Sequence, residues 1–454
     1  MTVSETIQDI LNIAGFDVNS QEFAQHLDNT ELSKFFAKYR SEFFLPKIGN
    51  IQPEGKTSDR PEDEVIYLVS NSLGLLNKRT KKLIEEELDV WSKKGVFGHF
   101  SHDFQRPWKD IDETSLPMMA KVIGAKVVET SIMCTLTANL HFLLNAFYKP
   151  TSTKYKILME DKAFPSDHYA IISQVKQHGL NPDTDIIYLK PRKGEYLIRE
   201  EDIFKAIEDE NLALILLPGV QYYTGQVFPM EEITRLGQSR GVKVGFDLAH
   251  AVGNIPLELN KWNVDFACWC TYKYLASGPG NIGGLFVHER YANASEMNRL
   301  IGWWAHNPDT RFKMSNQLEL SPGAAGFQMS NPSVTNVVAL QGTLSIYNEF
   351  DMYKFREQSL LLTDYLELLI KSNSKLKSKI DIMTPEDSAR RGCQLSLLLI
   401  EEGADLVKIY NELLHYGVMT DERHPNCVRV APYPLINSFQ EIQQFVTILE
   451  KVLN

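Results

Sequence analysis

The chain has 454 residues, of which 43% are hydrophobic and 23% charged, and its formal net charge is −11. At about 150 residues per domain, this length predicts two to three domains around a large core. The acidic balance argues against nucleic acid and anionic membranes as partners, because both attract lysine- and arginine-rich surfaces.

The first twenty residues carry acidic side chains and lack the apolar core of a signal peptide. No segment reaches the roughly 18 apolar residues that a membrane span needs. The five cysteines, at positions 134, 268, 270, 393 and 427, are scattered without a zinc-site spacing. This pattern is typical of reduced thiols, so we expect a cytoplasmic protein with no metal site.

Residues 1–65 are predicted to form helices joined by a polar connector at 51–64. From about residue 130, short apolar segments alternate with amphipathic ones, which predicts an α/β fold with a sheet covered on both faces. The expected strands are 131–135, 155–160, 185–189, 212–217, 242–250, 264–270 and 283–289, and the expected helices are 138–148, 168–179, 199–210 and 230–241.

After about residue 335 the pattern changes. One long helix is predicted at 336–372, followed by a strand at 393–400, a helix at 404–417, a strand at 427–432 and a final helix. This order predicts a smaller α+β domain. The expected organisation is a helical segment at 1–65, a large domain at 66–335 and a small domain at 336–454.

Two predicted strand-to-helix turns suit a ligand. Near Leu136 and Thr137 the free amides and dipole of a helix start favour an anion, although a plain threonine cap explains the same residues. Phe164 precedes Ser166 and Asp167 at another helix start. These are also ordinary capping residues, but an aromatic side chain beside them suits a flat ring.

Two further positions carry charge at strand ends. Asp247 ends an apolar strand shortly before His250, where a carboxylate is costly to bury unless a cation or hydrogen-bond donors meet it. Lys273 is the only charged residue of "CWCTYKYLASGPGNIGG" (268–284), and it is either a surface lysine or one held in a pocket. Beside Tyr272 an ammonium loses solvation, which favours the neutral amine that forms a Schiff base.

Together these positions suit pyridoxal 5′-phosphate (PLP). Its ring nitrogen needs a carboxylate to stay protonated, its phosphate needs a helix start, and its aldehyde needs an amine. Asp247, the turn at Thr137 and Lys273 supply these three groups. Each position is ambiguous alone, whereas the set predicts a PLP site.

With these residues the chain resembles fold-type I PLP enzymes, which share the aspartate aminotransferase architecture, and among them the class V aminotransferase group. More closely, it resembles the kynureninase family. The resemblance implies a large domain with a mainly parallel seven-stranded sheet and a smaller α+β domain. The matching segments are NSLGL (71–75), GVFGHF (95–100), RPW (106–108), FPSD (164–167), GVQYYTGQ (219–226), FDLAHAVGN (246–254), DFACWCTYKYL (265–275), MSNPS (329–333) and RVAPYPLINSF (429–439).

The resemblance also implies an activity, a hydrolase acting on carbon–carbon bonds of ketonic substrates. It would cleave the Cβ–Cγ bond of L-kynurenine or 3-hydroxy-L-kynurenine to give anthranilate or 3-hydroxyanthranilate and L-alanine. Such a reaction belongs to tryptophan catabolism towards NAD. A homodimer with its active site at the subunit interface is implied as well.

Residue roles follow from the same resemblance. Lys273 would hold PLP as a Schiff base and move the Cα proton, Asp247 would pair with the ring nitrogen, and Tyr272 would relay a proton. Arg429 would hold the substrate α-carboxylate, although the residue alone is equally consistent with a structural salt bridge. The implied cofactor contacts are Leu136, Thr137, Phe164, Pro165, Ser166, Asp167, Asp247, His250, Tyr272 and Lys273, with Trp303 and Asn331 from the neighbouring subunit, and the implied substrate contacts are His99, Ser330, Asn331 and Arg429.

Two features depart from the family pattern. Pro218 stands where a serine that contacts the cofactor is common, and Pro279 and Asn281 interrupt a loop that is usually a plainer glycine run. Neither feature involves Lys273 or Asp247, so both bear on cofactor affinity rather than on the reaction.

Other functions fit the same fold. Among class V enzymes the alternatives are a cysteine desulfurase, a selenocysteine lyase or an aminotransferase. The first two need a mobile cysteine, whereas Cys393 and Cys427 fall in predicted strands. An inactive PLP-fold binding protein is the remaining alternative, and the presence of both Lys273 and Asp247 argues against it.

Overall fold

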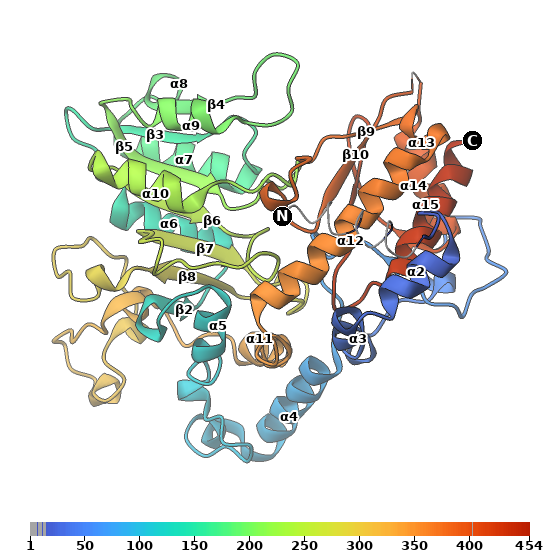
Figure 1. The fold of residues 1–454 in the computed structure, drawn as a ribbon. Coiled ribbons are helices and arrows are strands. Elements are labelled where there is room, and N and C mark those ends of the chain that lie inside the picture. The colour runs from blue at the N-terminus through green and yellow to red at the C-terminus, as the bar shows by residue number, and fades with distance from the viewer. Residues whose placement is uncertain (1–6, 8–10, 12–14, 402) are drawn as a thin grey trace. The chain divides into compact units, whose positions relative to one another are not determined.

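The computed structural model describes residues 7, 11, 15–401 and 403–454 (Figure 1). The described chain divides into two compact units. Unit 1 comprises the described residues up to Lys78, the short stretch Tyr222–Val227 and Phe350–Asn454, and unit 2 comprises Arg79–Gln221 and Phe228–Glu349. The domain boundaries expected near residues 65 and 335 stay predictions.

Unit 2 is built on a seven-stranded sheet of order β2-β8-β7-β6-β5-β3-β4. The strands from β7 to β4 are mutually parallel, and β8 runs antiparallel to β2 and β7. This confirms the predicted α/β fold with a mainly parallel sheet. The strands are β2 Thr130–Ile132, β3 Lys156–Glu160, β4 Ile186–Leu189, β5 Leu212–Pro218, β6 Lys243–Asp247, β7 Phe266–Cys270 and β8 Gly283–Val287.

Helices cover both faces of this sheet, with α10 in front and α6 and α7 behind in Figure 1. Alternate residues of β5 separate the two faces: Leu214 packs in a buried cluster with α6 and α7, whereas Ile215 approaches Gly237 of α10. Central strands covered on both sides have to be apolar throughout, and β7 and β8 are buried at every residue. The helices of unit 2 are α4 Lys78–Lys94, α5 Leu116–Val122, α6 Leu136–Phe147, α7 Pro165–Gln177, α8 Pro182–Asp185, α9 Glu200–Ala206, α10 Met230–Ser239 and α11 Val334–Tyr347.

Two predicted helix starts lie too late in the sequence. The helix expected at 168–179 begins at Pro165, with Phe164 as its N-cap residue. Proline suits this first position because its fixed φ is helical and its missing N–H would have had no partner there. Likewise α6 begins at Leu136 rather than residue 138. The residues predicted to bind the cofactor at these turns therefore lie in the first turns of helices.

The single long helix predicted at 336–372 is wrong. The structure has two helices, α11 and α12 (Met352–Ser372). The Asp351 side chain accepts a hydrogen bond of 2.8 Å from the Tyr353 amide, so it caps the start of α12. The apolar periodicity continues across the break and therefore predicted one helix. The capping interaction, which favours a non-helical conformation of Asp351, ends that continuity in the structure.

Removing this cap should destabilise the protein measurably. We expect Asp351→Ala to lower the free energy of unfolding by about 1 kcal/mol, because the first amides of α12 lose their acceptor. Urea unfolding followed by circular dichroism measures this difference. Glu357→Ala, an exposed change within the same helix, is the matched control and should stay within about 0.5 kcal/mol of wild type. Equal effects of the two changes would contradict the capping role.

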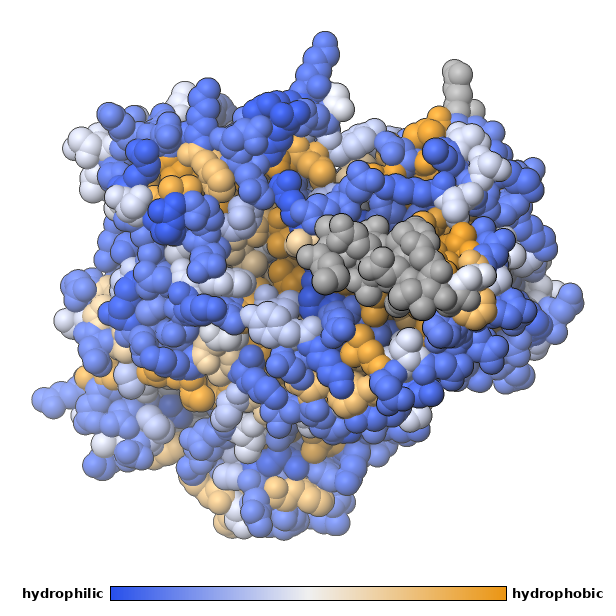
Figure 2. Space-filling view, viewed as in Figure 1, coloured by the Kyte–Doolittle hydropathy of each residue, from blue (hydrophilic) through white to orange (hydrophobic). Residues whose placement is uncertain are grey.

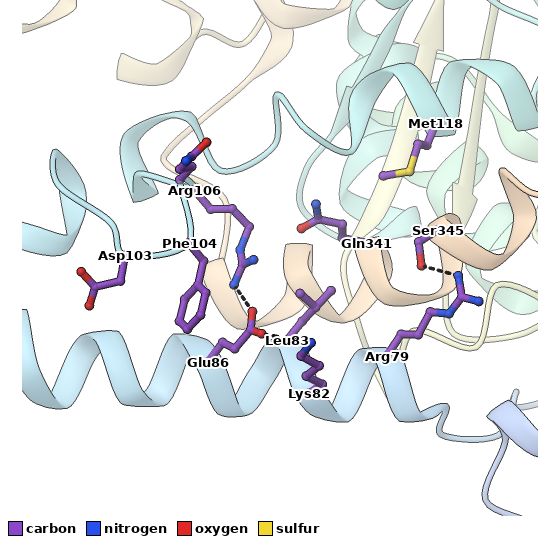
Figure 3. Close-up of a pocket in the computed structure, with 11 residues that line it drawn as sticks. Arg79, Lys82, Leu83, Glu86, Asp103, Phe104, Arg106, Met118, Gln341 and Ser345 are labelled. Atoms are coloured by element: carbon purple, nitrogen blue, oxygen red, sulfur yellow. Dashed lines mark hydrogen bonds and ion pairs between the residues drawn. The ribbon is translucent and has the colours of Figure 1, made fainter.

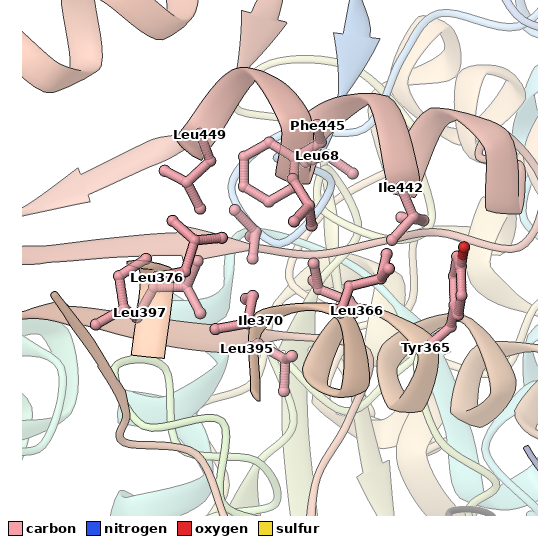
Figure 4. Packing of buried hydrophobic residues seen from close by; sticks show 14 of the residues in the cluster. Leu68, Tyr365, Leu366, Ile370, Leu376, Leu395, Leu397, Ile442, Phe445 and Leu449 are labelled. Atoms are coloured by element: carbon pink, nitrogen blue, oxygen red, sulfur yellow. The ribbon is translucent and has the colours of Figure 1, made fainter. Parts of the chain in front are cut away.

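Unit 1 combines a four-stranded antiparallel sheet, β12-β13-β10-β9, with a parallel pair, β1-β11. Its core joins α12 and α15 to β10 through apolar side chains such as Leu366, Phe445 and Leu397 (Figure 4). Cys393 was predicted to lie within the strand 393–400, but the observed strand β10 begins two residues later, and Cys393 is buried just before it. The elements of unit 1 are α2 Gln21–Asp28, α3 Glu31–Ala37, β1 Ile66–Tyr67, α12, α13 Ser374–Lys377, β9 Ile380–Ile382, β10 Leu395–Leu399, α14 Leu406–His415, β11 Val418–Met419, β12 Asp421–Arg423, β13 Cys427–Val430 and α15 Phe439–Leu453.

The surface on view is largely hydrophilic, with apolar atoms in small separate areas (Figure 2). Among the described helices, none combines the length and the apolar character needed to cross a membrane. The described residues also contain no cluster of histidine, cysteine and acidic side chains that could hold a metal ion.

Candidate active site

The candidate site lies at the carboxyl edge of the unit 2 sheet. Asp247 is the last residue of β6, and Lys273 follows the last residue of β7 by three positions. These strands are parallel neighbours, with Asp247 opposite Cys268. The same edge of a parallel sheet is where loops and helix starts meet a ligand. The predicted proximity of Asp247 and Lys273 is supported by their electrostatic interaction, in which the Lys273 charge opposes protonation of Asp247.

A second carboxyl, Asp167, meets Asp247. Asp167 is 5% exposed and Asp247 6% exposed. Burial raises the pKa of both groups, and the charge of Asp247 raises the pKa of Asp167 further. The Ala249 amide donates to Asp247 Oδ1 at 2.7 Å, and the two carboxyls hydrogen-bond each other. Such a pair holds a proton between its members when nothing else neutralises it.

This pair suits a ligand that brings a positively charged N–H donor. Asp167 Oδ1 is buried and accepts a hydrogen bond from none of the described residues. An unsatisfied buried acceptor is costly, and a protonated ring nitrogen beside the pair would neutralise its charge. The pyridinium nitrogen of the predicted cofactor fits this requirement.

Phe164 supplies an aromatic face near the lysine. It is the N-cap residue of α7 and is 45% exposed, so its ring is accessible to a ligand. Lys273 Nζ lies 5.8 Å from the centre of its ring. A flat ring attached to that amine would therefore have a stacking surface within reach.

The start of α6 is shaped as an anion site. Cys134 leaves β2 with a left-handed φ of 44°, and the helix follows at Leu136. The side chain of Thr135, the N-cap residue, makes no capping hydrogen bond. A Cβ at Gly283 would lie only 3.1 Å from the Leu136 nitrogen, so glycine lets β8 approach this turn closely. Amides of the first helical turn lack intrahelical acceptors and attract a phosphate.

Tyr272 and His250 complete this group. Burial, followed by the charge of Cys270, raises the pKa of Tyr272, which keeps the phenol protonated and able to donate a hydrogen bond. His250 is buried, with its ring centre 6.5 Å from that of Tyr274. The group at this edge comprises the predicted residues Leu136, Thr137, Phe164, Pro165, Ser166, Asp167, Asp247, His250, Tyr272 and Lys273.

Four other predicted residues form a second group. Ring contacts lead from His99 through Phe100 and Phe312 to Trp303. The ring centres are 6.3 Å apart for the first pair and 5.6 Å apart for each of the next two. The backbone of Trp304 donates to the Met329 carbonyl, which brings the segment with Ser330 and Asn331 beside Trp303. Three of the four, His99, Trp303 and Ser330, are exposed.

Arg429 lies on β13 of unit 1. Its side chain is 1% exposed, and its Nη2 donates to Asp421 Oδ2 at 2.6 Å. Its Nη1 donates to the Tyr222 carbonyl. The salt bridge considered from the sequence is therefore present. Asp421 was not identified from the sequence, because β12 and β13 were not predicted as a pair.

The comparisons with known proteins agree along the whole chain. Residues 355–449 match the family model described as the kynureninase C-terminal domain. Human kynureninase is 43% identical over 459 residues, covering 99% of this chain and 97% of that protein. The kynureninase of Flavobacterium psychrophilum is 44% identical, covering 95% and 98%, and kynureninase 2 of Aspergillus niger is 45% identical, covering 96% of each.

The chain belongs to the kynureninase family. Solved structures of lower identity share its fold. A cysteine desulfurase from Escherichia coli gives a TM-score of 0.72 at 15% identity, over 92% of this chain and 98% of that one. A cysteine desulfurase from Thermococcus onnurineus gives 0.70 at 17% identity, over 86% and 94%. These likenesses confirm the predicted fold class, that of fold-type I enzymes.

The two departures from the family pattern have local structural roles. Pro218 ends β5 opposite Asp247, and the next amide, of Gly219, donates to the Asp247 carbonyl at 2.8 Å. Proline at a strand end costs no ladder hydrogen bond. Asn281 is buried and accepts from the Ile282 amide at 2.6 Å while donating to the Ser277 carbonyl, so it holds the loop after Lys273 in place.

The sequence interpretation missed a third buried carboxyl near this edge. Glu160 is the last residue of β3 and is 6% exposed. Burial raises its pKa to about 7, and its charge acts on Asp167. Gln221 donates to its Oε1 at 2.8 Å. The signal that pointed to Asp247, an acidic residue ending an apolar strand, was also present at Glu160.

The Glu160 carboxyl should make stability depend on pH. Its raised pKa means that the folded state keeps a proton that the unfolded state loses between about pH 4.5 and 7. The free energy of unfolding therefore falls as pH rises through this window, by about 3 kcal/mol for this group. We expect Glu160→Gln to remove this contribution to the pH dependence of the free energy of unfolding. Urea unfolding at several pH values measures it. Parallel curves for wild type and variant would contradict this.

Proposed function

We propose that this protein is a PLP-dependent hydrolase that cleaves L-kynurenine or 3-hydroxy-L-kynurenine into L-alanine and the corresponding anthranilate. The proposal is carried by the 43–45% identity to kynureninases over almost the entire chain. The chemistry of the first group of residues supports it, because an amine, a buried carboxyl pair and an open helix start lie at one sheet edge.

The residues fit PLP part by part. The first amides of α6, at Leu136 and Thr137, would bind the phosphate, and Phe164 would stack on the ring. Asp247 would hold the proton of the ring nitrogen, with Asp167 adding a second carboxyl behind it. Bound PLP supplies an aldehyde that captures the substrate amine and a ring that accepts the electrons of a broken Cα bond.

The chain's own residues would then move protons. Lys273 would release its amine on substrate binding and take the proton from the substrate Cα. Tyr272 stays protonated in its half-buried position, so it can donate to an oxygen that gains charge. The overall reaction consumes one water, whose oxygen enters the carboxyl group of the anthranilate, while the cleaved Cβ gains a proton and becomes the methyl group of alanine.

Product analysis tests this function directly. Purified protein is incubated with PLP and each substrate separately, and the products are separated by chromatography. We expect alanine and the matching anthranilate in equal amounts. Release of sulfide from cysteine without cleavage of either substrate would instead favour a desulfurase. The burial of Cys393 and Cys427, both 0% exposed, argues against that outcome because a desulfurase needs an accessible thiol.

We also propose that two copies form a homodimer. An apolar patch, defined here as Val96, Phe97, Phe100, Trp303, Phe312 and Met314, is 45 to 72% exposed. Phe312 contacts both Phe100 and Trp303 with ring centres 5.6 Å apart, which joins the segment of residues 96–100 to that of residues 303–314. Exposed apolar patches of this kind are typical of protein interfaces. A second copy is the occupant favoured here, because Trp303 is predicted to reach the partner's cofactor.

A charge in the apolar patch should dissociate this dimer. We expect Phe97→Asp, at a side chain that is 72% exposed in the single chain, to weaken dimerisation at least about 100-fold. Activity should fall in parallel, because Trp303 and Asn331 would no longer reach the site of the neighbouring subunit. Sedimentation velocity over a concentration range measures the association. Tyr196→Asp, another exposed aromatic of unit 2, is the control, and equal dissociation by both variants would contradict the assignment of the patch.

A cytoplasmic location is proposed as well. All five cysteines are unpaired thiols in the structure, and four of them are buried. Reduced cysteines are typical of proteins in a reducing compartment. Fractionation of cells that express the protein, with markers for each compartment, tests this location.

A further inference from the structure

Arg106, Pro107 and Trp108 of the RPW motif have no role in the site described so far. They belong to the segment of residues 95–110, which follows α4 and carries His99. Trp108 contacts His99 edge-to-face, with ring centres 5.4 Å apart. A Cβ at Gly98 would lie 2.6 Å from the Trp108 indole, so the indole lies directly against the backbone next to His99. The position of Trp108 therefore restricts the position of His99.

One buried carboxylate holds this segment to α4. Glu87 is 2% exposed, and its Oε2 accepts from Trp108 Nε1 at 2.8 Å. The same oxygen lies 2.8 Å from His102 Nε2, and Oε1 accepts from Arg106 Nε at 2.9 Å. The His102 side chain is fully buried. A buried acceptor with three donors leaves all three unsatisfied when it is removed.

The neighbouring Glu86 also binds Arg106 and therefore serves as a control for Glu87. It faces a pocket of about 600 Å³ and accepts from Arg106 Nη2 at 2.8 Å (Figure 3). Its side chain is 16% exposed, and its other ion pair is with Lys82 at 3.8 Å. Glu86 thus binds the same arginine as Glu87, whereas the hydrogen bonds to His102 and Trp108 are made by Glu87.

We propose that Glu87 is a positioning residue that sets substrate specificity by holding Trp108, and through it His99, in a fixed orientation. The inference rests on the proposed function and on the role that the family resemblance implies for His99, which is to line the pocket for the aromatic ring of the substrate. A ring contact that moves by about 1 Å no longer distinguishes a 3-hydroxyl group from hydrogen. Glu87 touches neither substrate nor cofactor and acts through the indole.

The test compares Glu87→Gln with Glu86→Gln. Glutamine keeps the size of Glu87 but turns one acceptor into a donor that faces donors. We expect the ratio of kcat/KM for 3-hydroxykynurenine over kynurenine to fall about tenfold in Glu87→Gln. In Glu86→Gln it should stay within about twofold of wild type. Hydrogen exchange of residues 95–110 should speed up only in Glu87→Gln, measured on protein without substrate.

A second, more conservative substitution tests the inference even if Glu87→Gln does not fold. Trp108→Phe keeps an aromatic ring but removes the Nε1 donor, so it should lower the same ratio without unfolding the segment. An unchanged ratio in Glu87→Gln, despite faster exchange of residues 95–110, would overturn the inference, as would equal effects of the two glutamate changes. Failure of the proposed function is seen separately, because the wild-type protein would then cleave neither substrate.

Discussion

Replacing Lys273 with alanine should abolish turnover. The variant loses both the amine that captures the cofactor aldehyde and the base that takes the substrate Cα proton, so we expect activity to fall by at least about 10³-fold. The yellow absorption of lysine-bound PLP should disappear with it. Borohydride reduction of wild type followed by peptide mass spectrometry should find PLP attached within residues 268–284, and the alanine variant should carry none there.

The control for this prediction is Lys261→Ala. Lys261 has a side chain that is 73% exposed, so its removal leaves the candidate site intact and should change activity less than about twofold. Cofactor attached to another lysine in wild type, or full activity in Lys273→Ala, would contradict the role assigned to Lys273. Circular dichroism of both variants should match wild type.

Replacing Asp247 with asparagine should lower activity but raise the stability of the protein without PLP. Asparagine can still accept from the Ala249 amide, but it cannot balance the charge of a protonated ring nitrogen. We expect kcat to fall by about 10²–10³-fold, equivalent to about 3–4 kcal/mol for one lost buried charge pair. Without PLP, however, the variant should be more stable than wild type near neutral pH by about 1–2 kcal/mol, because Asp167 loses its like-charged neighbour.

The stability difference between wild type and Asp247→Asn should increase as the pH rises. Both carboxyls have raised pKa values in the folded protein, so the wild-type fold binds protons that the unfolded chain has already lost. The stability of wild type therefore falls as pH rises above the normal range of an aspartate, and the advantage of Asp247→Asn grows in the same direction. Urea unfolding of both proteins without PLP measures this. A variant less stable than wild type at neutral pH would argue against the carboxyl pair.

Much of the large unit could be predicted because its strands are short, apolar and regularly spaced. Asp247 and Lys273 were predicted as site residues from one chemical argument, that an isolated charge at the end of an apolar strand needs a partner. The break before α12 was missed because apolar periodicity continues through it, although Asp351 is a standard N-cap residue. There the local capping signal should have outweighed the periodicity.

Pairings between distant segments could not be predicted in the same way. The Asp167–Asp247 pair depends on where the first turn of α7 meets the end of β6, which no local pattern contains. The contacts of Glu87 are of this kind too, because they join one helix to three residues of a loop. Side-chain hydrogen bonds follow the tertiary arrangement, so they become visible only with coordinates.

The discontinuous course of unit 1 has a consequence for biosynthesis. Asp28, at the end of α2, accepts from the amide of Phe439 at 2.7 Å, and β1 pairs with β11. The hexapeptide Tyr222–Val227 also belongs to this unit, and its first carbonyl binds Arg429. On the ribosome the earliest helices must therefore wait for the last hundred residues before their partners emerge. Unit 1 cannot be expressed as one continuous segment of the chain. The sheet of unit 2, by contrast, has all its strands once residue 287 has left the exit tunnel.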